Sequence, residues 1–361
     1  MDRNPLLAVD DLKVHFPVGG GLIRRAGTAV RAVDGVSFSV PRGTTFGIVG
    51  ESGSGKTTTA LAVMRLVQHT GGQIRLGGSD IGNAAGETLR RERRRFQMVF
   101  QDPFASLNPR RRVGDAVRDA LDLMQVGEPR GRAARVRELL AAVGLRPEQH
   151  ALFPHQFSGG QRQRIVLARA LAAHPELLVC DESVAALDVS VQAQVLNLFA
   201  ELRRALGLTY VFISHDLGVV RHLSDRVAVM YLGRVVEIGP VAEIFSAPRH
   251  PYTQALLAAM PRVQTGRQQF AAISGEVASP VNPPGGCHFH PRCPRAEARC
   301  AVETPVVAER EGVRVVGLGP ASGDESISAA ERGGKDRHRA DGDIYPGMAA
   351  GKTAEARSDA Q

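Results

Sequence analysis

Residues 50–58 constrain the fold more than any other part of the chain, because they read Gly-Glu-Ser-Gly-Ser-Gly-Lys-Thr-Thr. They follow an apolar run of strand type at 45–49 and precede 60–64, which is typical of a helix. Glycines let such a loop turn its backbone N–H groups inward, and the N-terminus of the following helix adds partial positive charge. This pattern between a strand and a helix predicts a phosphate-binding loop in an α/β fold.

Two side chains of this loop have specific expected roles. Lys56 places a full positive charge near the terminal phosphates of a ligand, and Thr57 supplies a hydroxyl to Mg²⁺. The alternative is a glycine-rich loop that matches by chance, which the flanking elements and the motifs below disfavour. The candidate phosphate-binding residues are Gly50, Ser52, Gly53, Ser54, Gly55, Lys56, Thr57 and Thr58.

Polar side chains follow two further apolar runs. The run 177–180 ends in Asp181 and Glu182, and the run 209–213 is followed by Ser214 and His215. Buried parallel strands bind ligands at their carboxyl ends, so Asp181 is expected to hold Mg²⁺ and Glu182 to orient and deprotonate an attacking water. A solvated turn is the alternative for the two carboxylates, and a structural role is the alternative for His215.

Gln101 comes directly after the strand expected at 96–100. At the end of a buried strand, a glutamine can reach a phosphate or its metal ion. A plain polar residue at a strand end is the alternative, and it is disfavoured only because the other motifs are present.

A second candidate anion site begins at Ser158, which is followed by Gly159, Gly160 and Gln161 and opens a helix expected through 173. Serine is a good N-cap, and the glycines expose backbone N–H groups at the helix start. The segment has no lysine of its own. Its alternative interpretation is a capped helix without a ligand.

The remaining pattern indicates strands at 6–16, 30–40 and 71–78 and a hairpin at 227–238. Asp34-Gly35 is read as a turn signal inside the second of these. Helical spacing extends over 113–143 with a break near 127–131. Phe16 could stack on an adenine ring or serve the core.

Composition excludes several classes of protein. No stretch approaches the eighteen apolar residues of a membrane span, and no apolar region follows residues 1–5 as in a signal peptide. The net charge of +8 comes almost wholly from arginine. It could indicate a nucleic-acid or anionic-membrane surface, but the chain has no basic stripe interleaved with aromatics, so composition bias is favoured and no nucleic-acid partner is expected.

Together these motifs resemble the ATPase subunit of the ATP-binding cassette (ABC) superfamily over about residues 6–244. The loop 50–58 is similar to the Walker A motif, and 177–182 is similar to the Walker B strand with its catalytic Glu182. Phe157 stands where the superfamily commonly has Leu. The other matches are the Q-loop Gln101, the signature Ser158, Gly159, Gly160 and Gln161, the D-loop Asp188 and the switch histidine His215.

The resemblance implies a P-loop NTPase fold: a RecA-like core with an antiparallel β subdomain, a helical insertion and a small C-terminal appendage. It also implies ATP and Mg²⁺ as ligands, with two ATP molecules buried between head-to-tail subunits. Each ATP would then lie on one Walker A loop and under the other subunit's signature and D-loop. Glu182, His215 and Gln101 would be catalytic, the last two as sensors of the γ-phosphate, and Thr57, Gln101 and Asp181 would serve the metal.

Three segments are similar to the dipeptide/oligopeptide importer branch of this superfamily, namely 100–109, 250–253 and 287–294. In that branch the ATPase pairs with a different ATPase subunit beneath two membrane permeases, which work with an external binding protein. The chain would then be peripheral, on the cytoplasmic face of the cell membrane. The expected domains are an ATPase unit at 1–246 with its insertion at about 102–172, an extension at 247–318 and a disordered tail at 319–361.

Three cysteines of the extension, Cys287, Cys293 and Cys300, raise the question of an iron–sulfur cluster, which some relatives hold with four cysteines. The fourth cysteine, Cys180, belongs to the Walker B strand. The sequence therefore argues against an all-cysteine cluster, while His288, His290 or a foreign ligand could complete a metal site.

Two alternatives to a peptide importer remain open. One is an ABC ATPase without a transporter, acting in DNA repair or on ribosomes. Such proteins usually carry two cassettes or a long coiled-coil insertion, which this chain lacks. The other is a nickel importer, because nickel importers share the pattern. A module that binds ATP without hydrolysing it is opposed by Glu182 and His215.

Overall fold

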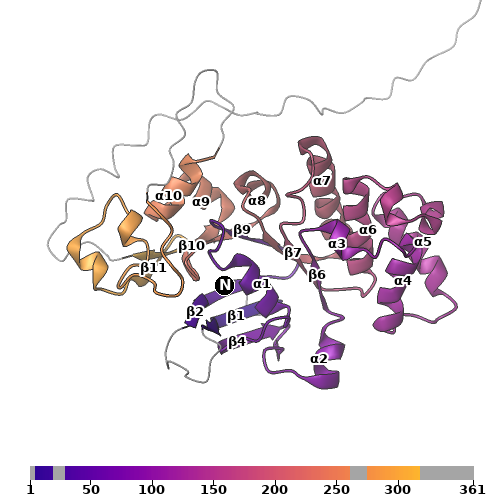
Figure 1. The fold of residues 1–361 in the computed structure, drawn as a ribbon, viewed down its shortest axis with the longest axis horizontal. Coiled ribbons are helices and arrows are strands. Elements are labelled where there is room, and N and C mark those ends of the chain that lie inside the picture. The colour runs from indigo at the N-terminus through magenta and orange to yellow at the C-terminus, as the bar shows by residue number, and fades with distance from the viewer. Residues whose placement is uncertain (1–4, 19–28, 261–274, 318–361) are drawn as a thin grey trace, which may run out of the picture. The chain divides into compact units, whose positions relative to one another are not determined.

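The computed structural model describes residues 5–18, 29–260 and 275–317, which form two sheets with helices around them (Figure 1). The larger sheet has eight strands in the order β11-β12-β10-β9-β3-β8-β7-β6. From β9 to β6 all neighbours are parallel, and β10, β12 and β11 continue the sheet antiparallel. The strands are β3 Thr45–Val49, β6 Phe96–Val99, β7 Leu177–Asp181, β8 Thr209–Ile213, β9 Arg226–Tyr231, β10 Arg234–Pro240, β11 Val306–Arg310 and β12 Val313–Gly317.

The central strands β3, β7 and β8 are buried along their whole length. Their side chains alternate between two apolar cores: Leu178 and Cys180 enter one, whereas Leu177 and Val179 enter the other. Both faces of the parallel region are therefore covered, which explains why these strands read as continuous apolar runs. The expected α/β fold is confirmed.

The smaller sheet has four strands in the antiparallel order β2-β1-β4-β5, and it packs with α1 against one face of the larger sheet. The rings of Phe38 and Phe46 stack with centroids 4.8 Å apart and join the two sheets. The strands are β1 Leu7–Pro17, β2 Ala29–Val40, β4 Gly71–Leu76 and β5 Ser79–Asp80.

The turn expected at Asp34-Gly35 is wrong, because β2 continues through it. The pairing register shifts here, since Leu12 pairs with Val36 but Lys13 pairs with Asp34. Gly35 has φ +85°, which absorbs the irregularity as a bulge within the strand. The glycine therefore serves a bulge and does not end the strand.

Helices α3 to α6 gather at one end of the molecule (Figure 1), within the region expected to be a helical insertion. The break near 127–131 separates α4 from α5 as expected. Short 3₁₀ turns at Pro147–Ala151 and Pro154–Gln156 lead into α6. The helices are α1 Lys56–Val63, α2 Gly86–Glu92, α3 Pro103–Ser106, α4 Val113–Leu123, α5 Arg132–Ala142, α6 Gly159–Leu171, α7 Val189–Leu206 and α8 Leu217–Leu223.

The C-terminal part of the described chain comprises α9 Val241–Ser246, α10 Pro251–Ala258, two 3₁₀ turns and the strands β11 and β12. Strand β12 pairs with β10, so this part extends the main sheet. Its buried residues Tyr252, Phe289 and Val313 belong to a third apolar core, to which β3, β9, β10 and α8 also contribute. The 3₁₀ turns are His290–Arg292 and Ala298–Ala301. The tail expected to be disordered, 319–361, lies outside the described residues, as does most of the loop expected before residue 28.

Candidate functional site

The loop between β3 and α1 has the backbone of an anion-binding loop. Gly50, Gly53 and Gly55 all have positive φ values, of 152°, 77° and 100°. A Cβ on Gly55 would overlap the carbonyl oxygen of Ala32, and one on Gly50 would overlap that of Met230. Only glycine therefore fits these two positions, and the loop is held against neighbouring backbone.

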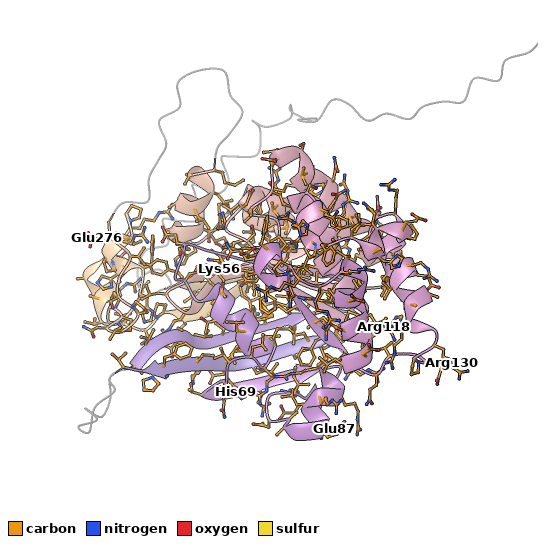
Figure 2. All side chains as sticks on the ribbon, turned by 45° about the vertical axis from the view of Figure 1, so that its right-hand side comes forward. Lys56, His69, Glu87, Arg118, Arg130 and Glu276 are labelled. Carbon is orange, nitrogen blue, oxygen red and sulfur yellow. The ribbon has the colours of Figure 1, made fainter. Side chains whose placement is uncertain are left out.

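Lys56 is the first residue of α1 (Figure 2), and its side chain turns back over the loop. Its Nζ donates hydrogen bonds to the carbonyl oxygens of Gly50 and Glu51, each at 2.8 Å. Burial lowers the pKa of the lysine, and the nearby carboxylates of Glu182, Asp181 and Glu51 oppose that shift. The ammonium thus rests on two carbonyls that a phosphate oxygen could replace.

Thr57 and Asp181 meet at the start of α1. The threonine Oγ1 donates to Asp181 Oδ1 at 3.2 Å, although the residues are 124 positions apart. Burial raises the pKa of Asp181, the charge of Glu182 raises it further, and Thr57 and Lys56 oppose the shift. A hydroxyl and a carboxylate side by side are hard oxygen donors that suit Mg²⁺, which keeps several water ligands and needs few from protein.

Glu182 and His215 lie at the ends of adjacent strands. His215 Nδ1 is 3.0 Å from Glu182 Oε1, and the Glu182 backbone N–H donates to the carbonyl oxygen of Ile213. Glu182 has φ +45°, a strained conformation for this residue type. Its side chain is 19% exposed, so water can still reach it.

Gln101 lies two residues beyond the end of β6, in an exposed bend. Because Val99 pairs in parallel register with Cys180, Gln101 lies at the same sheet edge as the two carboxylates. No hydrogen bond of its side chain is present among the residues that the structure describes. Its catalytic and metal roles therefore stay predictions.

The Ser158 segment forms a capping box at the start of α6. Ser158 Oγ accepts from the Gln161 N–H at 3.3 Å, and Gln161 Oε1 accepts from the Ser158 N–H at 3.0 Å. Gly160 lies so close to Val191 of α7 that a Cβ on it would overlap the valine. Asp188 is the exposed N-cap residue of α7, so the signature and D-loop segments are neighbours.

Within the described part of the chain, no hydrogen bond or ion pair joins this segment to the loop of residues 50–58. The structure therefore brings together Lys56, Thr57, Asp181, Glu182 and His215, and it leaves the signature separate. Phe16 is 41% exposed near the end of β1, so the alternative core role is wrong, and adenine stacking stays a prediction.

The three cysteines of the extension lie close together, and the Cys287 N–H donates to the carbonyl oxygen of Cys300. Burial raises the pKa of the Cys287 thiol, and the neighbouring sulfurs of Cys293 and Cys300 add to that shift. Across residues 5–18, 29–260 and 275–317, no group of three or more His, Cys, Asp or Glu side chains is placed to hold a metal ion.

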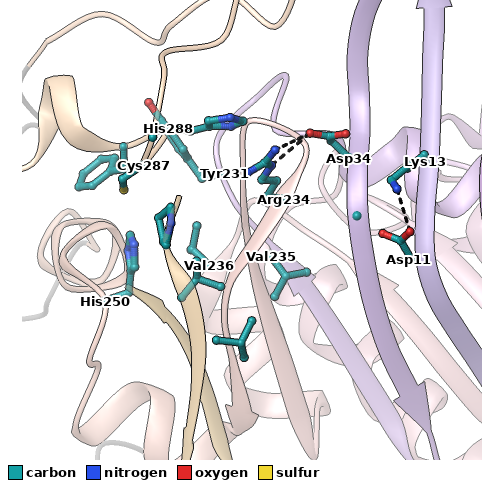
Figure 3. A pocket seen from close by; sticks show the side chains of 16 residues that line it. Asp11, Lys13, Asp34, Tyr231, Arg234, Val235, Val236, His250, Cys287 and His288 are labelled. Atoms are coloured by element: carbon teal, nitrogen blue, oxygen red, sulfur yellow. Dashed lines mark hydrogen bonds and ion pairs between the residues drawn. The ribbon is translucent and has the colours of Figure 1, made fainter. Parts of the chain in front are cut away.

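A cavity of about 320 Å³ lies between the extension and the strands β1 and β2 (Figure 3). Arg234 donates to Asp34 at 2.7 Å on one wall, and His250, Cys287 and His288 line the side of the extension. No residue of the loop 50–58 lines it, so the cavity is separate from the candidate phosphate site.

The sequence interpretation missed one set of contacts. Arg292 and Tyr252 of the extension both bind Glu51, the second residue of the phosphate loop. Tyr252 is 201 positions and Arg292 241 positions away from Glu51 in the sequence, and no local pattern links them.

Two family models match this chain, and the first of them covers the phosphate loop and the Asp181–Glu182 pair. Residues 33–185 match the ABC transporter family model, and residues 236–300 match that of the oligopeptide/dipeptide transporter C-terminal region. No helix in the described part of the chain is both long and apolar enough to cross a membrane.

Named relatives match over nearly their full length. The oligopeptide transport ATP-binding protein AppF of Bacillus subtilis is 49% identical, over 85% of this chain and 95% of its own. The di/tripeptide transport ATP-binding protein DppF of Pseudomonas aeruginosa is 46% identical, over 83% of this chain and 93% of its own.

Solved structures with the same fold include the ATP-binding cassette MJ0796, determined as a dimer in a post-hydrolysis state with ADP and Pi. It is 26% identical to this chain, with a TM-score of 0.57 over 65% of this chain and 98% of its own. CbiO1 of Clostridium perfringens is also 26% identical, with a TM-score of 0.59 over 68% of this chain and 92% of its own. The chain therefore belongs to the ABC transporter ATPases, in the group that carries the oligopeptide/dipeptide transporter C-terminal region.

Proposed function

We propose that this chain hydrolyses ATP to drive the import of di- or oligopeptides. The observation that carries the catalytic part is the Glu182–His215 hydrogen bond beside Lys56, at the edge where the parallel strands end. The named relatives carry the peptide part, since AppF is an oligopeptide and DppF a di/tripeptide transport protein.

We propose one role in hydrolysis for each of these side chains. The backbone N–H groups of the loop and Lys56 bind the β- and γ-phosphates, and Lys56 exchanges its two carbonyl partners for phosphate oxygens. Glu182 orients the attacking water and accepts its proton, and His215 holds the Glu182 carboxylate. Bound through Thr57 and Asp181, Mg²⁺ would supply charge neutralisation to the phosphates.

The separate signature segment supports assembly with a second ATPase subunit. Ser158 opens a helix whose first N–H groups can bind an anion, yet this segment makes no contact with its own chain's phosphate loop. The dimeric state of MJ0796 supports the same arrangement. We propose that the partner is a different ATPase chain and that Gln101, Asp188 and the signature act at the joint sites.

Peptide ABC importer ATPases work with permease subunits, so this chain is proposed to lie at the cytoplasmic face of the membrane, beneath two permeases. An extracytoplasmic binding protein would select the peptide. The proposed boundaries are an ATPase unit at 1–246 and an extension at 247–318. The match of 236–300 favours this function over an ABC ATPase that acts in DNA repair or on ribosomes, and a nickel importer is the second candidate.

The variant Glu182→Gln tests the catalytic assignment. Since glutamine keeps the shape but cannot accept a proton, ATP binding should persist while turnover falls by about a hundredfold or more. Full turnover in this variant would exclude Glu182 as the base.

Purification of the tagged chain from detergent-solubilised membranes tests the importer. Recovery of permease subunits is expected. Recovery of ribosomes or DNA without permeases would instead support the non-transport function.

A further inference from the structure

We propose that the C-terminal extension is a working part of the nucleotide site, in which Arg292 and Tyr252 are positioning residues for the phosphate loop. Their common target is Glu51. This inference rests on the proposed role of the loop 50–58 in binding ATP, and the experiment below separates the two.

All three polar groups of Glu51 are engaged. Its carboxylate accepts two hydrogen bonds from the Arg292 guanidinium, at 2.7 and 3.0 Å, and its backbone N–H donates to the Tyr252 hydroxyl at 2.9 Å. Its carbonyl oxygen accepts from Lys56 Nζ at 2.8 Å. The extension therefore holds the residue on which the phosphate-binding lysine rests.

The extension presents these groups from a rigid base. Tyr252 is fully buried, with its ring 4.8 Å from that of Tyr231 and 5.4 Å from that of Phe289. His250 caps the helix of Tyr252 by accepting its backbone N–H, and the buried Glu237 accepts the N–H of His250. Tyr252 therefore has little freedom to follow Glu51 if the loop moves.

Arg292 is equally constrained. Its side chain is 4% exposed, and its guanidinium lies over the Tyr231 ring at 5.8 Å. The paired carboxylate raises the pKa of the guanidinium, so it is charged under all usual conditions. A bidentate pair of this kind fixes both the position and the charge of Glu51.

The charges of the Arg292–Glu51 pair bear on phosphate binding. A carboxylate within a loop that binds phosphate would repel the ligand, and Glu51 acts electrostatically on Lys56 in this structure. Arg292 neutralises that carboxylate. The pair is therefore expected to favour ATP binding, beyond any contribution to the docking of the extension.

The test measures the affinity of the full-length chain for a fluorescent ATP analogue. Replacing Arg292 by methionine keeps much of the side-chain volume but leaves the Glu51 carboxylate unpaired, so Arg292→Met should weaken binding about tenfold, equivalent to ~1.4 kcal/mol. Arg292→Lys keeps the charge with fewer hydrogen bonds and should lose less. The double variant Glu51→Gln/Arg292→Met removes the repelling charge and should bind nearly as the wild type does.

The matched control is Arg249→Met, in the same extension. Arg249 pairs with Glu311, whose side chain is 80% exposed, and its own side chain does not contact the loop. This variant should bind ATP as the wild type does. In steady-state hydrolysis by the assembled transporter, Arg292→Met should raise the KM for ATP about tenfold and change kcat less, because the loop is weakened before the chemical step.

Two results would overturn the inference: Arg292→Met binding as tightly as Arg249→Met, or the double variant staying as weak as Arg292→Met. If Arg292→Met fails to fold, Arg292→Lys and its double variant with Glu51→Gln carry the same comparison. If the wild type takes up no nucleotide, or binds equally well after Lys56→Ala, the proposed function itself fails. Lys56-dependent binding that is indifferent to Arg292 refutes this inference alone.

Discussion

His250 makes the extension sensitive to acid, and the effect can be calculated. The side chain is 5% exposed, and its Nδ1 accepts the backbone N–H of Tyr252 at 3.0 Å. Burial lowers the pKa of His250 from 6.5 to about 4. A protonated Nδ1 could not accept that N–H, so acid must break the helix cap or leave the histidine neutral at a cost.

The direction of this pH effect follows from the linkage between proton binding and folding. Between pH 6.5 and 4 the unfolded segment binds a proton at His250 that the folded one does not, so stability is complete above pH 6.5 and falls as the pH falls toward 4. With these two pKa values the loss between pH 7 and pH 5 is about 2 kcal/mol. That loss corresponds to a roughly twentyfold increase in local opening.

Hydrogen exchange of the Tyr252 amide, followed by mass spectrometry on the full-length chain, measures this opening directly. The comparison variant is His250→Asn, whose side-chain oxygen can cap the helix without titrating. At pH 7 the two proteins should exchange at similar rates.

At pH 5 the wild type should open about twentyfold more often than at pH 7 relative to the variant. His288, whose pKa burial also lowers to about 4, titrates in both proteins and cancels. An equal response of the two proteins to pH would refute the reasoning.

Three glycine variants test the packing of the phosphate loop and of the signature segment. Gly55→Ala should abolish binding of the fluorescent ATP analogue, because its Cβ would overlap the Ala32 carbonyl at a positive φ. Gly53→Ala has open space around it and should weaken binding by less. Equal losses of affinity in the two variants would contradict this account. Gly160→Ala should leave nucleotide binding by the isolated chain unchanged but lower hydrolysis in the assembled transporter several-fold, since its Cβ would displace Val191 at the start of α7. Unchanged hydrolysis in that variant would argue against the signature's role.

The convergence of the candidate catalytic residues could be predicted because sheet geometry determines it. Asp181 pairs in register with Ile213, so the residues that follow β7 and β8 must lie side by side. Apolar runs identified both strands, and the polar residues after them identified the edge. The loop motif, and not the sheet, predicts Thr57 as an oxygen donor to Mg²⁺, and in the structure its hydroxyl lies 3.2 Å from Asp181 Oδ1.

The Asp34-Gly35 signal failed because tertiary contacts give those residues another use. Asp34 accepts hydrogen bonds from Arg234 and is hydrogen-bonded to His15, which keeps it within the strand. The pKa of Asp34 is lowered by these two partners against the opposing effect of burial. A turn signal reports local preference only, and two partners distant in sequence outweigh it here.

The contacts of Arg292 and Tyr252 with Glu51 could not be predicted from the sequence, for a different reason. The cassette match at 33–185 contains Glu51, whereas the match at 236–300 contains Arg292, so the pair joins two segments that are recognised separately. A phosphate loop with a carboxylate at its second position needs a cation that does not compete with Lys56 for the ligand. Arg292 meets that need because its side chain is only 4% exposed and donates two hydrogen bonds to the Glu51 carboxylate. The Arg292–Glu51 pair therefore couples the extension to the phosphate loop, beside the Tyr252 hydrogen bond, and removing the extension should weaken ATP binding by at least as much as Arg292→Met does.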